Sequence, residues 1–596
     1  MGVALLALAI GSLPAGLASG SFPEPYHRPT ELFAGSLGRP KPSPPRVDSL
    51  PPEAVVSHQG NDNFAAAILR FPRQAVGRAL AFGRSRSCAA VAALLLSGLL
   101  NAHRRLCAEK KAALMEFVQS VETGSYHTQI FTTASLPWKT GTAINPLLRA
   151  AYLASAGFRV TLCLPWLHPA EQAIVYPNGI VFETPAEQEA FVRNWLLKHD
   201  GEHPPFEISF YPARYDLDRG SILPLGDTSR WMSASAGDLC ILEEPEHLNW
   251  YHLGRNWRRV FKLVVGVVHT NYISYARMYQ PAGAGPLRFI NTGVCRAYCD
   301  RLIKLSDTLQ PLPRSMVCNV HGVRSEFIEL GRATSQKQLT GGAYFIGKVL
   351  WAKGYSHLID YLAQEVASGK EPTRIDIFGP KTGDDFEQVE AAAKKAGVAL
   401  QFCGGCDHSD KAVHSYRVFV NPSQTEVLST TTAEALAMGK FVLIRRHVSN
   451  DFFTQFENTL LFETPDEFLS QLQFALSATP APLTEEERHT LSWAGATDRF
   501  RQSIALCAQL AKPPSLTDRL VAAAFGFAEN GGYSGNVMRY LSGAGPVTKQ
   551  RWLHQQQHFR SSKDVVEVVE KSVEVAPPPT ISQQQSIAER TVRTRS

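Results

Sequence analysis

The chain has 596 residues, of which 44% are apolar and 19% are charged, with a net charge of +6. This length exceeds one ordinary domain, and the composition is ordinary for a soluble globular protein, so two packed domains with appendages are expected. The modest net charge gives no indication of nucleic-acid binding, and we expect no nucleic-acid partner.

Residues 1–124 are predicted to be an N-terminal extension. Two apolar runs, MGVALLALAIGSLPAGLASGSF and CAAVAALLLSGLLNA, are interrupted or too short to predict a membrane span. The intervening residues 23–52 are Pro-rich and predict a linker. Residues 1–110 hold 12 Lys and Arg against 6 Asp and Glu. A basic, acid-poor region is typical of organelle targeting or membrane-surface attachment, and a variable disordered tail is the alternative.

From Gln129 the pattern alternates between strands and helices, which predicts a first α/β domain over residues 125–325. Predicted strands are QIFTTASL, RVTLCLPW, FEISFYP, DLCILEEP and LVVGVVHT, and predicted helices are TAINPLLRAAYLASAG and AEQEAFVRNWLLKH.

The alternation restarts after Val323 and predicts a second α/β domain over residues 326–495, with a helix at 496–515 that crosses back to the first. Its predicted elements are GAYFIG, GYSHLIDYLAQEVA, RIDIFG, DFEQVEAAAKKAG and LQFCG, followed by the unit described next. Residues 516–596 are predicted to be a C-terminal extension, which beyond about residue 565 has too little apolar surface to fold.

The stretch 421–440, NPSQTEVLSTTTAEALAMGK, predicts a loop followed by a short helix. Ser429 or Thr430 can cap the helix start, and Gly439 supplies a left-handed end. Glu434 then lies about one turn into the helix, and Glu426 lies in the loop before it. The flanking apolar runs RVFVN and FVLIRR predict strands. Ligands bind such units at the carboxyl end of the strand, beside the helix N-terminus.

Two further loops of the second domain point to the same ligand. In GKVLWAKG, Lys348 and Lys353 stand between a strand and a helix, where they could neutralise a diphosphate leaving group. In RIDIFGP, a strand ends at Gly379, as close approach of the backbone to a nucleotide base would require.

Each of these signals has a plainer interpretation. Lys348 and Lys353 could be solvated surface residues, and Glu434 could merely complement the helix dipole. The Ser/Thr run could be only a cap. Three such loops at the carboxyl ends of successive strands nevertheless favour one ligand site.

Ten cysteines are scattered without a repeating spacing, which indicates a reducing compartment and no disulfide framework. Cys163, Cys240 and Cys318 lie in apolar segments and are expected to be buried. Cys403 and Cys406 form one C-G-G-C, which falls short of the four ligands of a zinc site, so no metal site is predicted.

The pair Glu426 and Glu434, an E-x7-E motif, together with GKxxxxKG resembles the retaining glycosyltransferases of GT-B fold. The segments ASLPWKTGTAINPLLRAAYLA, SILPLGD, ILEEPEHLNWYH, VVGVVHTNYISYAR, NVHGV, YFIGKVLWAKGY, TTAEALAMGKFVL and LSWAGATDRF resemble, more narrowly, the digalactosyldiacylglycerol synthases of plant and algal plastids. The likeness runs from about residue 125 to 512, and LEEPEHLNWYH and HTNYISYAR are its most specific parts.

The resemblance implies an α/β GT-B fold, with two Rossmann-like domains facing a cleft and a C-terminal crossover helix. It implies that Lys348 and Lys353 bind the donor diphosphate, that Glu426 orients the galactosyl group, and that Glu434 binds the ribose. It also implies that the Gly141 loop approaches the phosphates from the first domain and that His269 faces the transferred sugar. On the residues alone, His269 would read as a core or capping histidine.

The chain departs from the family pattern at several positions. Lys348 replaces the usual Arg, which loses bidentate phosphate recognition but keeps the charge. Glu426 stands where the plant enzymes often have Asp, and Val448 where they tend to have Pro. The cysteines of FCGGCDH are also unexpected. None of these changes removes a required chemical group.

The implied reaction transfers galactose from UDP-galactose to monogalactosyldiacylglycerol with retention, without a metal ion. The lipid acceptor implies work at a membrane surface, and the resemblance implies peripheral or interfacial attachment to the outer envelope membrane of the chloroplast. Two alternatives stay open: a retaining glycosyltransferase with another UDP-sugar or acceptor, and a catalytically silent GT-B protein that binds envelope lipids.

Overall fold

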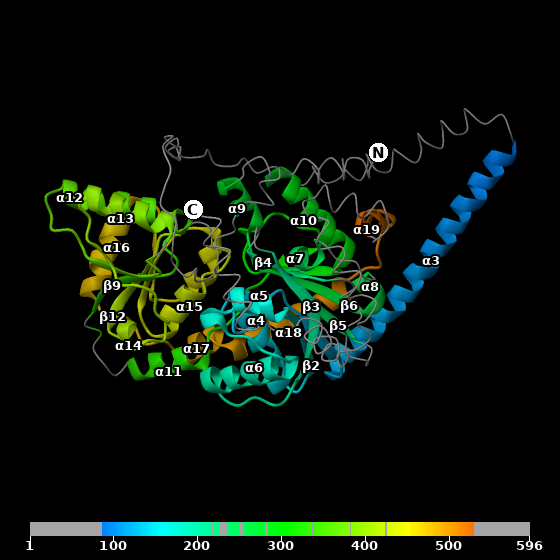
Figure 1. Ribbon diagram of the computed structural model, residues 1–596, viewed down its shortest axis with the longest axis horizontal. Helices are drawn as coiled ribbons and strands as arrows, with labels where there is room; N and C mark the ends of the chain where they lie inside the picture. The colour runs from blue at the N-terminus through cyan, green and yellow to red at the C-terminus, as the bar shows by residue number, and fades with distance from the viewer. Residues whose placement is uncertain are drawn as a thin grey trace, which may run out of the picture.

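The computed structural model describes residues 86–216, 220–225, 228, 237–250, 256–279, 284–334, 339, 341–381, 383–423 and 426–529. The predicted first apolar run, the Pro-rich linker and the C-terminal tail beyond residue 565 lie outside the described residues. The described chain forms two α/β halves, each built on one sheet (Figure 1).

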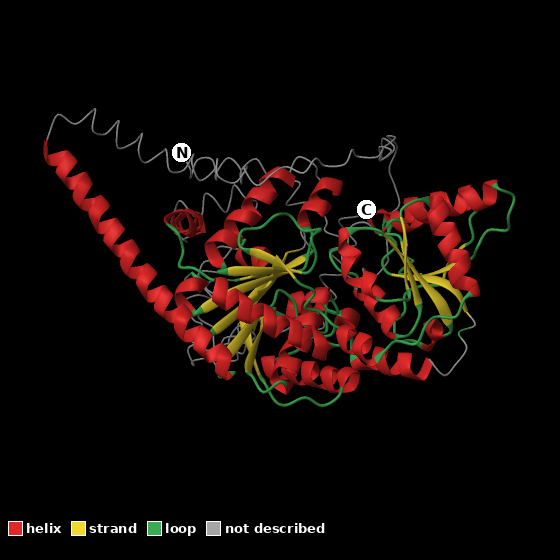
Figure 2. Cartoon of the chain, turned by 180° about the vertical axis from the view of Figure 1, so that it is seen from behind, coloured by secondary structure: helices red, strands yellow, loops and turns green. Residues whose placement is uncertain are grey.

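The first half is built on an eight-stranded sheet in the order β4-β3-β2-β1-β5-β6-β7-β8. All neighbouring strands are parallel except β3 and β4, which pair antiparallel. The predicted strands are uninterrupted apolar runs because helices cover both faces of the sheet (Figure 2). The strands are β1 (His127–Phe131), β2 (Arg159–Trp166), β3 (Glu207–Asp216), β4 (Ser221–Pro224), β5 (Leu239–Glu243), β6 (Leu263–Val268), β7 (Arg301–Lys304) and β8 (Ser315–Val317).

The helices of the first half include both that the sequence predicted, α4 and α6. Thr184 caps α6 by accepting a hydrogen bond from the amide of Glu187, and Gly201, with φ of +86°, ends it. The helices are α4 (Gly141–Ser155), α5 (Pro169–Val175), η2 (Pro177–Gly179), α6 (Pro185–Asp200), α7 (Pro245–Asn249), α8 (Trp257–Val260), α9 (Tyr272–Tyr279) and α10 (Ala284–Tyr298).

The second half is built on a six-stranded parallel sheet in the order β11-β10-β9-β12-β13-β14. Its strands are β9 (Gly341–Ile346), β10 (Ile375–Phe378), β11 (Leu400–Phe402), β12 (Tyr416–Asn421), β13 (Phe441–Arg445) and β14 (Thr459–Phe462). Its helices are α11 (Ser325–Thr334), η5 (Trp351–Lys353), α12 (Tyr355–Ala367), α13 (Asp384–Ala396), α14 (Lys411–His414), α15 (Thr430–Ala437), η6 (Val448–Gln455), α16 (Pro465–Ser477) and α17 (Glu485–Leu491).

In each sheet, successive strands are added on one side of the first strand, and the chain then returns, at a switch point, to add the remaining strands on its other side. In the first sheet this switch point lies between β1 and β5, and in the second between β9 and β12. Loops that leave the carboxyl ends of such a strand pair turn away from each other and leave room for a ligand. The sequence-predicted site residues follow strands at or next to these two points.

Three helices at the ends of the described chain pack on the first half. The crossover helix α18 (Trp493–Leu510) buries Trp493 and Phe500 in the first core, as the sequence predicted. A further helix, α19 (Leu516–Glu529), packs on α10, although the sequence analysis placed no helix there. The helix α3 (Arg86–Thr123) buries Leu114 and Phe117 in the same core, and its other end projects from the body (Figure 1). Among the described residues, no helix is both long and apolar enough to cross a membrane.

The two halves meet through the loop that carries Glu426. Val427, the next residue, is buried in the core of the first half, and Leu428 packs against both cores. A backbone bridge between Val323 and Ser492 brings the two crossing segments together. The loop after β12 is therefore held by both halves, which fixes the position of Glu426 between them.

Candidate active site

The loop after β9 places Lys353 beside the end of β12. Gly354 makes this approach feasible, because its φ is +86° and a Cβ atom there would lie 2.4 Å from the carbonyl oxygen of Pro422. The amide of Lys353 donates to the carbonyl of Leu350, which closes the short turn η5. The lysine thus stands at the switch point of the second sheet.

Lys353 and Glu426, predicted separately from two loops, form an ion pair with 2.6 Å between Nζ and Oε1. Each side chain is 21% exposed, so the pair remains accessible to a ligand. The positive charge of Lys353 acts on Lys348, which stands on the same loop. Burial first, and that charge second, lower the pKa of Lys348 to about 8.

Glu434 lies one turn into α15, as predicted, and is held by a neighbour that the sequence analysis missed. Ser429 caps the helix by accepting a hydrogen bond from the amide of Thr432. His408 Nδ1 donates to Glu434 Oε2 over 2.8 Å, and His408 Nε2 accepts from the buried hydroxyl of Tyr344 over 2.7 Å. The carboxylate is therefore oriented before any ligand arrives.

Gly379 follows β10, as predicted, but the structure gives a different reason for the glycine. A Cβ atom at this position would lie 2.2 Å from the carbonyl oxygen of Gly347. The residue therefore lets the loops after β9 and β10 pack together, and a nucleotide base is not needed to explain it. A contact between Gly379 and a base stays a prediction.

Gly141 is the first residue of α4, which follows β1 at the switch point of the first sheet. The residue before it, Thr140, occupies the capping position, and its hydroxyl bonds to the hydroxyl of Thr142, 3.0 Å away, instead of capping a helix amide. Among the described residues, a Cβ atom on Gly141 would meet only the side chain of Asn145, at 3.5 Å. The open start of a helix suits an anion, so the predicted role at the donor phosphates is compatible with this position.

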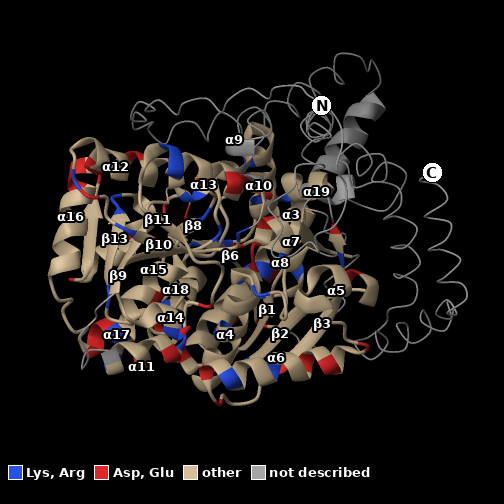
Figure 3. Cartoon of the chain, turned by 60° about the vertical axis from the view of Figure 1, so that its left-hand side comes forward, with Lys and Arg blue, Asp and Glu red and all other residues tan. Residues whose placement is uncertain are grey.

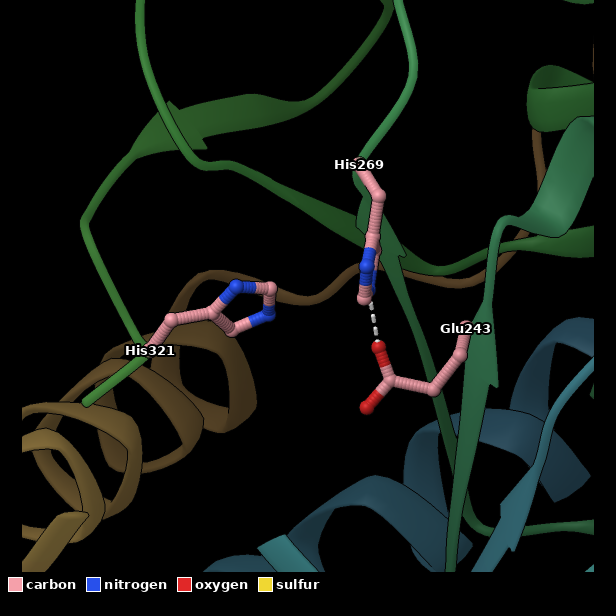
Figure 4. A group of neighbouring side chains, drawn as sticks. All are labelled: Glu243, His269 and His321. Carbon is pink, nitrogen blue, oxygen red and sulfur yellow. Dashed lines mark hydrogen bonds and ion pairs between the residues drawn. The ribbon is translucent and has the colours of Figure 1, made fainter. Parts of the chain in front are cut away.

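His269 directly follows β6 and is tied to a carboxylate that ends the neighbouring strand (Figure 4). Its Nε2 donates a hydrogen bond to Oε2 of Glu243, the last residue of β5. The other oxygen of Glu243 accepts from Nε of Arg149 on α4, over 2.6 Å, and both side chains are buried. Burial alone would raise the pKa of Glu243, but Arg149 and His269 hold it below its ordinary value. The ionised Glu243 therefore fixes the orientation of the His269 ring.

His321 completes this group, with its ring centroid 4.7 Å from that of His269. One ligand atom each from Glu243, His269 and His321 lie within 4.8 Å of one another, a spacing that could hold a metal ion. The charge of Glu243 is, however, already balanced by Arg149, and a divalent cation beside a guanidinium would be repelled. The group fits an oriented imidazole better than a metal centre.

Glu244, the residue after Glu243, forms a second polar group at the same sheet edge. Its φ is +61°, which is rare outside glycine, and its carboxylate accepts hydrogen bonds from Thr133, Thr270 and Tyr272. Burial would raise the pKa of Glu244, but hydrogen bonds, first of all with His247, lower it to about 2. The segments LEEPEHLNWYH and HTNYISYAR thus meet through Glu243 and Glu244.

The sequence analysis assigned roles to neither glutamate. A signal was present, since two consecutive acidic residues end an otherwise apolar strand. The sequence could not identify the partners of the two glutamates, because His269, Arg149 and Thr270 come from other elements. The same holds for His408, which stands far from Glu434 in the chain.

Two Rossmann-like sheets with strand-end residues at both switch points and a helix returning to the first half define a GT-B glycosyltransferase fold. The family described as "Glycosyl transferases group 1" matches residues 342–478. The chain is 46% identical over 383 residues to digalactosyldiacylglycerol synthase 2 of Arabidopsis thaliana, which covers 63% of this chain and 80% of that protein. The chain belongs to the digalactosyldiacylglycerol synthase family.

Synthase 1 proteins are similar to the chain over a smaller part of their length. The chain is 48% identical over 385 residues to digalactosyldiacylglycerol synthase 1 of Lotus japonicus, which covers 63% of this chain and 49% of that protein. The chain thus spans about half the length of such relatives.

Among solved structures, sucrose-phosphate synthase from Thermosynechococcus elongatus aligns with 64% of this chain and 98% of its own, at 14% identity and a TM-score of 0.41. That likeness is too low to carry an argument, and the fold assignment stands on the two sheets and the family.

Proposed function

We propose that the chain transfers galactose from UDP-galactose to monogalactosyldiacylglycerol and releases digalactosyldiacylglycerol and UDP. The observation that carries this proposal is the grouping of Lys348, Lys353, Glu426 and Glu434 at the switch point of the second sheet. Membership in a family named for this product supports the choice of lipid.

The donor would bind with its diphosphate at Lys348 and Lys353, whose charges oppose the negative charge that builds up as the sugar leaves. Glu434 would accept hydrogen bonds from the ribose hydroxyls, and its partner His408 keeps it in position. Glu426 would hold hydroxyls of the galactosyl group. Because Glu426 also pairs with Lys353, sugar and diphosphate would be positioned together.

Transfer with retention needs no carboxylate nucleophile here, because UDP is a good leaving group held by fixed charges. The bond between the anomeric carbon and the diphosphate breaks, and the acceptor hydroxyl oxygen forms its bond to the same face of that carbon. The departing phosphate oxygen takes the hydroxyl proton. His269, oriented by Glu243, would face the transferred sugar from the first half.

The proposed chemistry uses no metal ion, since two lysines and helix termini supply the positive charge. We expect turnover to continue in EDTA after the protein has been passed through a chelating resin. Loss of turnover in EDTA that a divalent ion restores would contradict this, and lysine-dependent UDP binding measured in parallel would show that the protein remained folded.

We place the reaction on the outer envelope membrane of the chloroplast, with peripheral or interfacial attachment. The word "chloroplastic" in the names of the relatives supports the organelle. The acceptor, a lipid, supports work at a membrane surface. Extraction of isolated envelopes with alkali tests the mode of attachment: release supports it, whereas retention in the membrane pellet contradicts it.

Substrate choice is tested by competition. Purified protein receives UDP-galactose and UDP-glucose together, with vesicles that contain monogalactosyldiacylglycerol, a sterol or diacylglycerol. We expect galactose on the galactolipid alone, with an α-anomeric proton signal for the new linkage by nuclear magnetic resonance. Preferred transfer of glucose, or to another acceptor, would overturn the proposal while leaving the donor site intact.

A further inference from the structure

A cavity of about 520 Å³ lies in the first half, between the helices α3, α8, α10 and α19. It is separate from the candidate active site. Arg258 to Lys262, which line it, precede β6, whereas His269 follows the same strand. The cavity therefore lies at the amino ends of the strands, opposite the candidate active site and near the place where α3 leaves the body (Figure 1).

The cavity has the size and the lining of a small-molecule site. Its volume falls within the range of about 300 to 1,000 Å³ that is typical of ligand pockets. Its walls are largely apolar, with Ala113, Phe261, Tyr298 and Ala522 among them. Exposed residues such as Arg259 and Ala523 also line it, so it reaches the surface.

Three arginines belong to the polar part of the lining: Arg258, Arg259 and Arg519. Arg258 is only 5% exposed, and within the described part of the chain its terminal nitrogen NH2 has no hydrogen-bond partner. The same is true of Nε of Arg519, also judged against the described residues. These two nitrogens are enclosed by protein atoms, so the donors within reach of a ligand in the cavity are those of the exposed Arg259 and the accessible part of the partly buried Arg519.

Acidic residues around the cavity do not cancel its positive charge. Asp300 lies between Arg258, at 2.7 Å, and Lys110, at 2.9 Å, so one carboxylate faces two cations. Asp518 likewise lies between Arg314, at 3.0 Å, and Arg296, at 3.8 Å.

The two remaining charged residues of the lining have partners of their own. Glu109 is paired with Arg105. Lys262 pairs with Glu116 and Asp238. More cationic than anionic side chains therefore line the cavity, which favours the binding of an anionic ligand.

We propose that this cavity binds an anionic amphiphile, a molecule with a phosphate head group and a single apolar chain. The arginine donors match the geometry of phosphate oxygens, and the apolar walls would shield part of the chain from water. The exposed residues Arg259 and Ala523 mark an opening through which such a ligand can enter from the surface. This binding site is independent of the proposed transfer reaction.

The test is isothermal titration calorimetry of the full-length protein with decyl phosphate, below its critical micelle concentration. We expect saturable binding of one molecule per chain. Inorganic phosphate, which lacks the chain, and decyl maltoside, which lacks the charge, are expected to bind at least about tenfold more weakly, a difference of about 1.4 kcal/mol. Equal binding of inorganic phosphate or of decyl maltoside would overturn the proposal, as would no saturable binding of decyl phosphate.

Two kinds of variant locate the site. Ala523→Trp, at the exposed rim, should block entry, and the double change Arg259→Gln with Arg519→Gln should weaken binding at least about tenfold. Leu520→Trp is the matched control, because Leu520 lies on the same helix, is 41% exposed and does not line the cavity. Arg332→Gln on α11 is the control for loss of an exposed arginine. Unchanged binding in Ala523→Trp, with the fold verified by thermal unfolding, would place the ligand elsewhere and refute the inference.

Discussion

Lys348 carries a pKa of about 8, because burial and the neighbouring charge of Lys353 disfavour its ammonium form. Below that pH the side chain is charged and attracts the diphosphate of UDP, and above it the side chain becomes neutral. We therefore expect the affinity for UDP to fall as the pH rises from about 8 towards 9.5, by up to about tenfold per pH unit. Calorimetric titration across this range measures the effect.

The substitution Lys348→Arg should remove that pH dependence, because arginine stays charged throughout the range. Its affinity near pH 7 should remain close to that of the unmodified protein. If the arginine variant retained the same decline, another group would be responsible, and Lys348 would not contact the diphosphate.

Glu243 is predicted to act by holding His269. In Glu243→Gln the shape is kept but the negative charge that pairs with Arg149 and His269 is lost, so the imidazole is expected to lose its fixed orientation. The transfer rate should then fall by up to about 100-fold, the size of effect expected for a misplaced group.

UDP affinity should change much less than the transfer rate in Glu243→Gln, since the two lysines and two glutamates of the proposed donor site belong to the other half and only the Gly141 loop lies in the half of Glu243. An equal loss of rate and of UDP affinity would indicate general disruption of the fold instead. Because a buried ion pair is broken, thermal unfolding must accompany the assay.

The roles of single residues were predictable where chemistry follows local pattern. Glu434 and its cap Ser429 could be placed on a helix from the sequence, because helix formers and a terminal glycine surround them. Glu243 and His408 were missed, since their significance depends on partners from distant elements. The burial of Cys318 was predicted wrongly: it directly follows a short edge strand and is only partly buried.

At the scale of elements, the long apolar strands and the helices α4, α6, α12 and α13 were predicted close to their observed bounds, whereas α10 and α16 were missed. β2 coincides with RVTLCLPW, and α12 begins one residue after the predicted start. Among the described strands of three or four residues, β10 and β11 were predicted and β4, β7, β8 and β14 were missed, because so few residues carry little pattern. The helix α19 was also missed, since its apolar face can be recognised as a packing surface only when α10 is known to lie beside it.

The turn between η5 and α12 depends on Gly354. In Gly354→Ala the residue would keep a left-handed φ of +86°, and its Cβ would collide with the carbonyl of Pro422 at 2.4 Å. Strain of this kind costs about 1 to 3 kcal/mol, so we expect a lower melting temperature and weaker UDP binding from the displaced Lys353.

Gly369→Ala is the matched control for this turn. Gly369 has a φ of +74°, but no atom of the described residues lies within 4 Å of the Cβ position. It should show the cost of the backbone conformation without the collision and should leave UDP binding unchanged. Equal stability and UDP affinity in the two variants would contradict the structural role given to Gly354.

At the scale of the whole molecule, the proposed site residues come from both halves: Gly141 and His269 from the first, and the group of Lys348, Lys353, Glu426 and Glu434 from the second. Glu426 stands beside Val427, which is buried in the core of the first half, and α18 packs on that core after leaving the second. The loop that carries Glu426 is therefore anchored in both halves. Alternation of strands and helices was sufficient to predict two α/β domains, whereas the contact through Val427 required the structure.

The most direct measurement of the central claim compares the unmodified protein with Glu434→Ala and the exposed control Glu463→Ala. Each is incubated with radiolabelled UDP-galactose and vesicles of monogalactosyldiacylglycerol, and the lipids are separated. We predict a labelled digalactolipid with the unmodified protein and with Glu463→Ala, and at least about a tenfold loss with Glu434→Ala, the effect of losing hydrogen bonds to a charged group. Unchanged label in Glu434→Ala would contradict the assignment of the active site, and no labelled lipid with any of the three would contradict the proposed reaction.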